Sequence, residues 1–160
     1  PAGWERKGGG ASKFLSCRFQ SGGAKIRVVA DVAGSALGDI ANMGGGAMEM
    51  AGDMLESDEI AEELSPVAQV HQVSIEQASE ELGELDIKTT ETIKTGFGDT
   101  RKSEFTVAGA LGSKTHGMLA TALGLNHRIR VICTCNDRHW KTLKPAFEEV
   151  IASLARGQAE

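Results

Sequence analysis

The feature that most constrains this chain is a strict alternation of apolar and polar residues along several short segments. It is clearest over residues 24–32, where apolar side chains take every second position and Lys25, Arg27 and Asp31 fall between them. Residues 129–135 carry a similar alternation. A period of two places the apolar side chains on one face of an extended strand. The chain is therefore expected to build a β-sheet against a hydrophobic core.

Turn signals connect these segments. Gly22 and Gly23 separate residues 13–19 from residues 24–32, which predicts an N-terminal β-hairpin. The second half of the chain is mostly sheet, with strands predicted at 85–94, around Phe105 and Val107, and at 129–135. Residues 116–124 fit a strand or a helix equally well by their periodicity.

Helical patterns fill the middle of the chain. We expect short helices at 35–43, at 57–64 and at 74–82, the last with Ser74 as its N-cap and Gly83 at its end. Strands at both ends with helices between them predict the α+β class with an antiparallel sheet.

A final helix is predicted near the C-terminus. Its apolar residues have helical spacing, at Phe147, Val150, Ile151 and Leu154. Because a proline is best tolerated in the first turn of a helix, Pro145 predicts that this helix begins near Thr142.

Charge is distributed unevenly along the chain. The net charge is −5, which argues against a general nucleic-acid binder. Residues 1–27 hold six basic residues against one acidic residue, residues 28–100 hold two against sixteen, and residues 101–160 hold nine against five. No apolar run approaches the roughly 18 residues needed to span a bilayer. This polarity suits a docking module whose basic end contacts an acidic partner.

The length of 160 residues predicts a single domain over residues 1–160, interrupted by a Gly/Met-rich insertion at about 44–56. The insertion is interpreted as a flexible loop, with a methionine-lined docking or soft-metal loop as the alternative. The first residue is Pro1 rather than a methionine, so we expect a processed product whose targeting segment lies outside this sequence.

One glycine-rich stretch imitates a nucleotide-binding loop. Residues 109–115 have two glycines before Lys114, but Ser113 separates Gly112 from the lysine and the first glycine is too close. The stretch is better interpreted as the turn of a hairpin. The sequence assembles no nucleophile with a base and an orienting group, so the chain is expected not to be an enzyme.

Histidines and cysteines offer one candidate ion site. His116 could face Asp137 if the two predicted strands that hold them are paired, and together they could hold a divalent cation such as calcium, manganese or zinc at the surface. The alternative is a structural hydrogen bond. Cys133 and Cys135 are two residues apart and poorly placed for a disulfide, and no tightly bound cofactor is expected.

The segment from Thr115 to Leu154 resembles the C-terminal half of PsbP-domain proteins. The resemblance is carried by a histidine that opens a strand, a second strand with small polar residues at its end, a charged run that closes on a tryptophan, and a last helix. These features correspond here to His116, Arg130 to Thr134, residues 137–140, and Val150 to Leu154.

The N-terminal end agrees with this resemblance. Residues 1–5 (PAGWE) resemble the PxGW opening of the family, and residues 24–32 resemble its second strand. Helices predicted near 39–41 and at 58–64 fall where the family has its own.

The resemblance implies an α–β–α sandwich around a central antiparallel sheet, located in the chloroplast thylakoid lumen. It implies a non-enzymatic extrinsic subunit, peripheral to the membrane, that docks on the lumenal face of a photosystem core beside other extrinsic subunits. In photosystem II such a subunit helps retain calcium and chloride and shields the oxygen-evolving manganese cluster. Two alternatives are an assembly factor of photosystem I or II and a GTPase-binding regulator, because that regulator shares the fold.

The candidate partner-binding residues follow from charge. Photosystem cores present acidic loops to the lumen, so the basic N-terminal region is the predicted docking surface. Its basic residues are Arg6, Lys7, Lys13, Arg18, Lys25 and Arg27.

Overall fold

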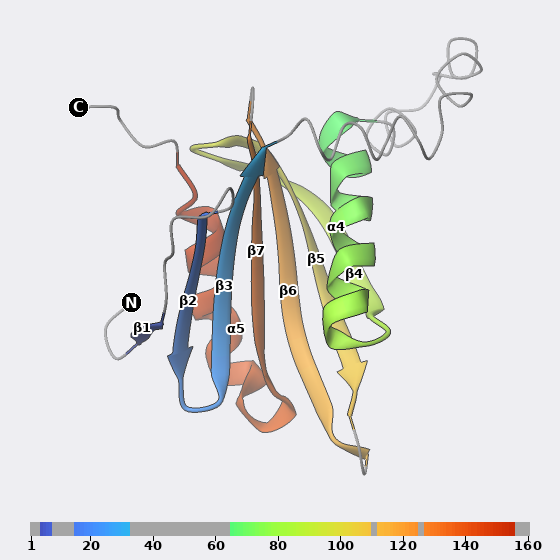
Figure 1. The fold of residues 1–160 in the computed structure, drawn as a ribbon. Coiled ribbons are helices and arrows are strands. Elements are labelled where there is room, and N and C mark those ends of the chain that lie inside the picture. The colour runs from blue at the N-terminus through green and yellow to red at the C-terminus, as the bar shows by residue number, and fades with distance from the viewer. Residues whose placement is uncertain (1–3, 8–14, 33–64, 110–111, 125–126, 156–160) are drawn as a thin grey trace.

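The computed structural model describes residues 4–7, 15–32, 65–109, 112–124 and 127–155. These residues form a seven-stranded antiparallel sheet and two helices (Figure 1), which confirms the predicted α+β class. In chain order the elements are β1 (Glu5–Lys7), β2 (Leu15–Ser21), β3 (Ala24–Val32), α4 (Pro66–Leu82), β4 (Asp86–Thr95), β5 (Gly98–Ala108), β6 (Lys114–Leu123), β7 (His127–Asn136) and α5 (Asp137–Ala152).

The strand order across the sheet is β1-β2-β3-β7-β6-β5-β4. Strands that are neighbours in the sheet follow one another along the chain, except for β3 and β7. This one pair joins the N-terminal strands to the C-terminal meander, with Val28 opposite Val131 and Asp31 opposite Arg128. The two segments with the clearest alternation therefore lie side by side near the middle of the sheet.

The predicted N-terminal hairpin is confirmed. β3 has the predicted bounds, and β2 is shifted by two residues from the prediction. Gly22 and Gly23 connect them with φ angles of 52° and 86°. Two consecutive left-handed residues form the type I′ turn that matches the twist of a hairpin, and glycine adopts this conformation without steric cost.

Residues 116–124, which fit strand or helix by periodicity, lie largely in β6. Gly117 to Ala122 are all buried. A strand covered on both faces has no solvent face to show a period of two, so its apolar run carries no alternation.

The helix predicted at 74–82 begins earlier than expected. α4 starts at Pro66, and the Ser65 hydroxyl accepts a hydrogen bond from the Ala68 amide at 3.3 Å. Proline is well placed at the first helical position because its missing N–H would have no partner there. Ser74 is not the N-cap: it is buried inside the helix, and its hydroxyl donates to the Val70 carbonyl at 2.8 Å. The predicted end at Gly83 is confirmed.

The C-terminal helix also begins earlier than Thr142. α5 starts at Asp137 directly after β7 and contains Pro145 in its interior. The first turns bring Trp140 onto the sheet, where it is 9% exposed. Burial of such a ring contributes on the order of 3 kcal/mol, which is comparable to the cost of a proline inside a helix.

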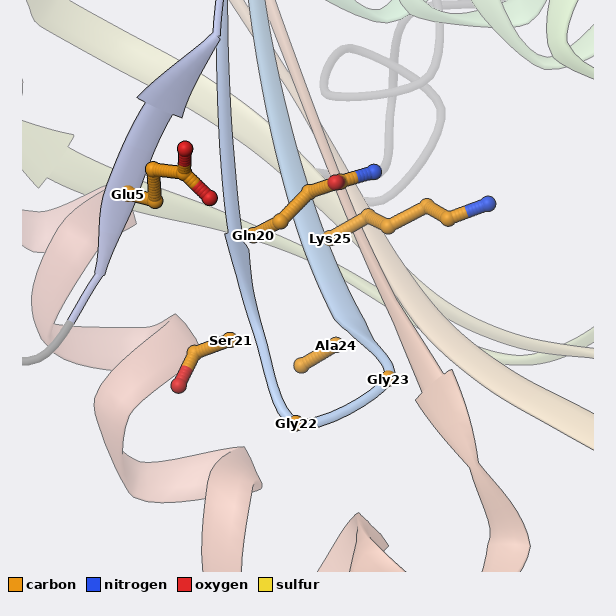
Figure 2. Close-up of a pocket in the computed structure, with 7 residues that line it drawn as sticks. All are labelled: Glu5, Gln20, Ser21, Gly22, Gly23, Ala24 and Lys25. Atoms are coloured by element: carbon orange, nitrogen blue, oxygen red, sulfur yellow. The ribbon is translucent and has the colours of Figure 1, made fainter.

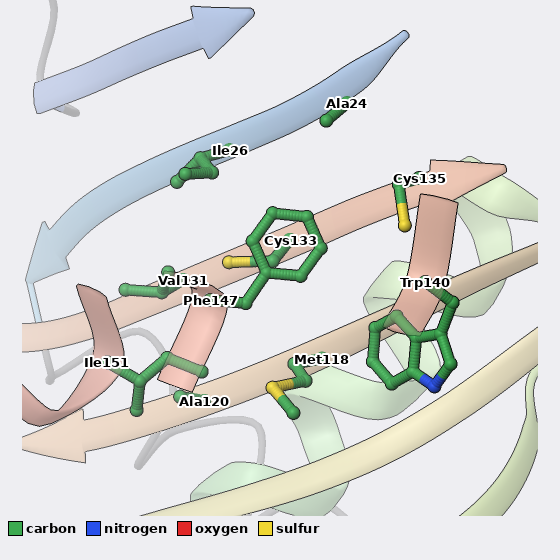
Figure 3. Close-up of a cluster of buried hydrophobic side chains, with 10 residues drawn as sticks. All are labelled: Ala24, Ile26, Met118, Ala120, Val131, Cys133, Cys135, Trp140, Phe147 and Ile151. Atoms are coloured by element: carbon green, nitrogen blue, oxygen red, sulfur yellow. The ribbon is translucent and has the colours of Figure 1, made fainter. Parts of the chain in front are cut away.

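The two helices cover opposite faces of the sheet, which confirms the predicted α–β–α sandwich (Figure 1). Under α5, Phe147 lies among Ile26, Val131 and Cys133, with Trp140 beside them (Figure 3). Under α4, a smaller cluster contains Ala78, Phe105, Val107, Leu119 and Ile132.

Several predictions fall outside the described residues. They are the helices at 35–43 and 57–64, the insertion at 44–56 and the position of Lys13. That the chain forms a single domain over residues 1–160 stays a prediction.

Candidate docking surface

Strand register brings part of the predicted basic surface together. Arg18 lies directly opposite Arg27, and Gln20 lies opposite Lys25. Residues opposite each other, or two positions apart on a strand, share one face of a sheet. Arg18, Lys25 and Arg27 therefore lie on the same face, which is the face that carries α4.

The other predicted residues are not part of this group. Arg6 lies opposite Phe19 in the register, so it belongs to the face that carries α5. Lys7 is opposite Arg18 in β1, but its side chain and the whole of Lys13 lie outside the described residues.

β7 adds two arginines that the sequence analysis did not include. Arg128 is opposite Asp31, and Arg130 is opposite Val29, so both lie on the face of Arg27. Because Ile129 and Val131 were expected to point into the core, the alternation itself placed these arginines on the other face. What the sequence did not contain was the pairing of β7 with β3. We call the five residues Arg18, Lys25, Arg27, Arg128 and Arg130 the basic face.

Three acceptors contact the basic face. Asp31 binds Arg128 through two hydrogen bonds, Nε–Oδ1 at 2.9 Å and Nη2–Oδ2 at 2.6 Å. From α4, Glu81 forms an ion pair with Arg27, and the Gln77 side-chain oxygen accepts from Arg130 Nη1 at 2.9 Å.

These acceptors do not provide a hydrogen bond for every guanidinium N–H of the basic face. Three buried nitrogens have no hydrogen-bond partner within the described part of the chain: Arg27 Nε, Arg128 Nη1 and Arg130 Nε. Arg128 is 3% exposed and Arg130 is 6% exposed. Burial lowers the pKa of Arg130, and the neighbouring charges of Arg128 and Arg27 lower it further. The basic face thus combines excess positive charge with unused donors.

A shallow hollow lies at the tip of the β2–β3 hairpin (Figure 2). It has a volume of about 540 Å³ and mixes a carboxylate, an amide, a hydroxyl and an ammonium group with three small residues. Its lining consists of Glu5, Gln20, Ser21, Gly22, Gly23, Ala24 and Lys25. Lys25 therefore belongs both to the basic face and to the rim of this hollow.

The contact predicted between His116 and Asp137 is confirmed. β6 pairs with β7, and His116 Nε2 lies 2.7 Å from Asp137 Oδ1 at the start of α5. The His116 ring stacks on Trp140 with centroids 5.1 Å apart and an interplanar angle of 24°. Lys144 Nζ lies 5.7 Å from the centroid of the same tryptophan ring.

This pair supplies few ligands for a metal ion. In residues 4–7, 15–32, 65–109, 112–124 and 127–155, no group of three or more His, Cys, Asp or Glu side chains could hold one. Among the described residues, none forms a hydrogen bond with the buried His116 Nδ1. A cation at His116 and Asp137 would have two protein ligands and take water for its remaining positions, an arrangement that fits weak binding.

A polar network lies between α4 and the sheet. His71 is 2% exposed and contacts the hydroxyls of Thr121 and Ser103, at 2.9 Å from Nδ1 and 2.8 Å from Nε2. Burial, with a smaller contribution from the charge of Arg101, lowers the pKa of His71 to about 3. The imidazole is therefore neutral near pH 7 and serves the packing of α4.

The glycine-rich stretch at 109–115, of which residues 110 and 111 lie outside the described residues, follows β5 and ends in β6. These strands are antiparallel, and the Gly109 amide donates to the Ser113 carbonyl at 2.7 Å across the turn. Lys114 is the first residue of β6. A phosphate loop leads from a strand into a helix, so the interpretation as a hairpin is confirmed.

Neither described helix is long and apolar enough to cross a membrane.

Solved structures that are similar in fold to this chain include the following two. One is the solution structure of CyanoP, the cyanobacterial PsbP of Synechocystis sp. PCC 6803, with a TM-score of 0.60 and 14% identity over 96% of this chain and 81% of that one. The other is a Pseudomonas aeruginosa protein of unknown function described as a putative regulator, with a TM-score of 0.54 and 12% identity over 99% of this chain and 90% of that one. No family model and no curated protein matches the sequence. The fold is therefore PsbP-like.

Proposed function

We propose that this protein is a non-enzymatic extrinsic subunit that docks on the lumenal face of a photosystem core in the chloroplast thylakoid lumen. The observation that carries the proposal is the basic face, which lies on a PsbP-like fold. Clustered arginines and lysines on one sheet face attract acidic loops over several ångströms and orient the encounter. Beside other extrinsic subunits, the docked domain excludes bulk water from the surface that it covers.

In its more specific form, the proposal is that the core is that of photosystem II. There the docked protein helps retain calcium and chloride at the manganese cluster by slowing their exchange with the lumen. This finer role is supported by the sequence resemblance to PsbP-domain proteins and by the fold likeness to CyanoP.

Charge reversal tests the docking. The variant Lys25→Glu/Arg27→Glu reverses two charges of the basic face, and Lys88→Glu/Lys94→Glu reverses two charges on β4 at the opposite edge of the sheet. Both variants are mixed with salt-washed photosystem membranes and sedimented. We expect the first to bind roughly tenfold more weakly and the second to bind like the wild type. Equal sedimentation of Lys25→Glu/Arg27→Glu and wild type would overturn the proposal.

The ion-retaining role has a separate readout. Washed photosystem II membranes are reconstituted with the protein, and oxygen evolution is followed as calcium and chloride are lowered. We expect activity to persist to lower concentrations of both ions than in membranes without it. Binding without this shift would leave an assembly or stabilising factor of photosystem I or II, which would also be substoichiometric in purified particles.

A second candidate is a GTPase-binding regulator, favoured by the fold neighbour described as a putative regulator. Its test is capture of a small GTPase by the immobilised protein, compared between the GDP-bound and GTP-bound states. Nucleotide-dependent capture that is lost in Lys25→Glu/Arg27→Glu would support it.

We also propose that His116 and Asp137 hold a divalent cation weakly. Support comes from their 2.7 Å contact and from the short stack of His116 on Trp140, which fixes the imidazole. Titration with zinc, manganese or calcium should change the tryptophan fluorescence of a Trp4→Phe variant in a saturable way, because the ion alters the imidazole that stacks on Trp140, and His116→Gln should abolish the saturable part. A wild-type signal without saturation would leave the pair as a structural hydrogen bond.

A further inference from the structure

The two ion pairs on the basic face differ in how deeply their side chains are buried. The Arg128–Asp31 pair is buried, with side chains 4% and 5% exposed, and its two parallel hydrogen bonds fix both groups. The Arg27–Glu81 pair is open, with side chains 29% and 38% exposed. An exposed pair contributes little net stability because water solvates both partners when they separate. Glu81 can therefore leave Arg27 at small cost.

The basic face also has more donors than acceptors. Arg27 Nε, Arg128 Nη1 and Arg130 Nε are buried and unpartnered within the described residues. Arg18 and Lys25 make no ion pair with any residue of the described part of the chain, and both are exposed. The side chains of this face that a partner's carboxylates can reach are the exposed Arg18 and Lys25 and the half-buried Arg27, because Arg128 and Arg130 are buried.

The chemistry of the existing acceptors indicates what the face accepts. Asp31 and Glu81 present carboxylates, and Gln77 presents an amide oxygen. Planar carboxylates match the fork of a guanidinium, which is how Asp31 binds Arg128. The net charge of −5 argues against a nucleic acid as the partner of this face.

We propose that the basic face binds carboxylates of an acidic polypeptide, and that Glu81 is an internal competitor that occupies Arg27 until a partner carboxylate displaces it. This inference rests on the proposed docking function and names the chemistry of its partner. Removing the charge of Glu81 frees Arg27 and strengthens binding. Removing the charge of the neighbouring Glu80, which pairs with no arginine of the described residues, changes only the net charge.

The test compares Glu81→Gln with Glu80→Gln. Both variants remove one negative charge from adjacent exposed positions of α4, so they have the same net charge. Binding of fluorescein-labelled poly-L-glutamate is measured by fluorescence anisotropy at low ionic strength, where screening is weak. We expect Glu81→Gln to bind about threefold more tightly than Glu80→Gln, the change that corresponds to freeing an exposed ion pair.

Two further measurements separate the competitor from general electrostatics. In an Arg27→Gln background, Glu81→Gln should give no more than the effect of Glu80→Gln, because the residue that it releases is absent. A single-stranded DNA of matched charge should bind more weakly than poly-L-glutamate. Urea unfolding of each variant shows that it is folded, and Glu81→Ala serves if Glu81→Gln is destabilised.

The outcomes are decisive in both directions. Equal affinities of Glu81→Gln and Glu80→Gln, or a gain that persists without Arg27, would overturn the role of Glu81. DNA binding as tight as that of poly-L-glutamate would overturn the carboxylate assignment. Neither result touches the membrane sedimentation of Lys25→Glu/Arg27→Glu, so the failure of this inference and the failure of the docking function are distinguishable.

Discussion

Asp31 and Arg128 form a buried ion pair with two hydrogen bonds, although they are 97 positions apart in the sequence. The pair lies where β3 ends and β7 begins, at the junction between the N-terminal strands and the C-terminal meander. With side chains 5% and 4% exposed, both charges are almost entirely removed from water. The pair therefore holds together two parts of the sheet that are connected by no short turn.

Removal of one partner should leave a buried charge without compensation. We expect Asp31→Ala to lower the free energy of unfolding by about 3–5 kcal/mol, as measured by urea denaturation. Asp99→Asn, which disrupts the exposed pair with Lys94, is the control and should cost less than about 1 kcal/mol. The apolar double variant Asp31→Leu/Arg128→Met should recover much of the loss. A small effect of Asp31→Ala would contradict a closed pair.

The stability of the protein should depend on the titration of His71. Its pKa is about 3 in the folded state, against 6.5 as the ordinary value. Between these values the unfolded chain binds a proton that the native state does not, so the contribution of His71 is fully present above pH 6.5 and is lost as the pH falls toward 3. The slope should be up to about 1.4 kcal/mol per pH unit.

His71→Gln isolates this contribution. The free energy of unfolding of wild type and variant is measured by urea denaturation between pH 7.5 and pH 4 at about half-unit intervals. The difference between the two proteins should shrink toward acid pH, because only the wild type loses the histidine contribution. His127→Gln, at an exposed position, is the control for the substitution of a histidine by glutamine. Parallel curves for His71→Gln would contradict a buried neutral imidazole.

A side chain at Gly117 should destabilise the protein. A Cβ at this position of β6 would meet the Phe105 ring and would lie 2.7 Å from the Cys133 carbonyl oxygen. The ring is fully buried and the carbonyl belongs to the central strand β7, so neither can move freely. We expect Gly117→Ala to destabilise by about 1–3 kcal/mol in urea denaturation. Gly124→Ala, whose Cβ meets the half-buried Phe97 ring at 3.0 Å, should cost less.

The thiols of β7 should be unreactive in the native state. Burial raises the pKa of Cys133 and of Cys135, and the charges of Cys135 and Asp137 respectively raise them further. In a Cys17→Ser background, a disulfide reagent at pH 8 should modify neither thiol until the protein is unfolded in urea. Rapid modification without denaturant would show that α5 opens from the sheet.

Most strands could be predicted from the sequence. In β3, the apolar residues that face α5 alternate with polar residues, and the pair Gly22–Gly23 marks the turn before it. Sequence reasoning did not decide between strand and helix for β6, because helices cover both faces of that strand and its residues show no alternation. It began both helices too late, for different reasons. Ser74 was predicted as an N-cap, whereas it lies inside α4 and its hydroxyl donates to the Val70 carbonyl. Pro145 was predicted to lie in the first turn, whereas it lies inside α5, where the burial of Trp140 offsets its cost.

The candidate surface was only partly predictable for a different reason. Alternation assigned Arg27 and Arg130 to polar faces of their own strands, but local pattern does not determine which strands are neighbours. The pairing of β3 with β7 is non-local, and Asp31, Gln77 and Glu81 acquire partners only through it and through the docking of α4. The His116–Asp137 contact was accessible because β6 and β7 are consecutive.

The β3–β7 pairing also shapes how the chain reaches its native state. The other strand pairs close through connections between consecutive strands, and hairpins of this kind form within about microseconds. β3 and β7 must find each other across nearly a hundred residues, as the Asp31–Arg128 separation of 97 shows, and such contacts slow folding. Until β3 and β7 meet, each of them has one edge whose backbone N–H and C=O groups are unpaired, and the two strands have the same alternation of apolar and polar residues. The N-terminal hairpin of one molecule can then complete the meander of another, so refolding at high concentration should favour exchanged dimers.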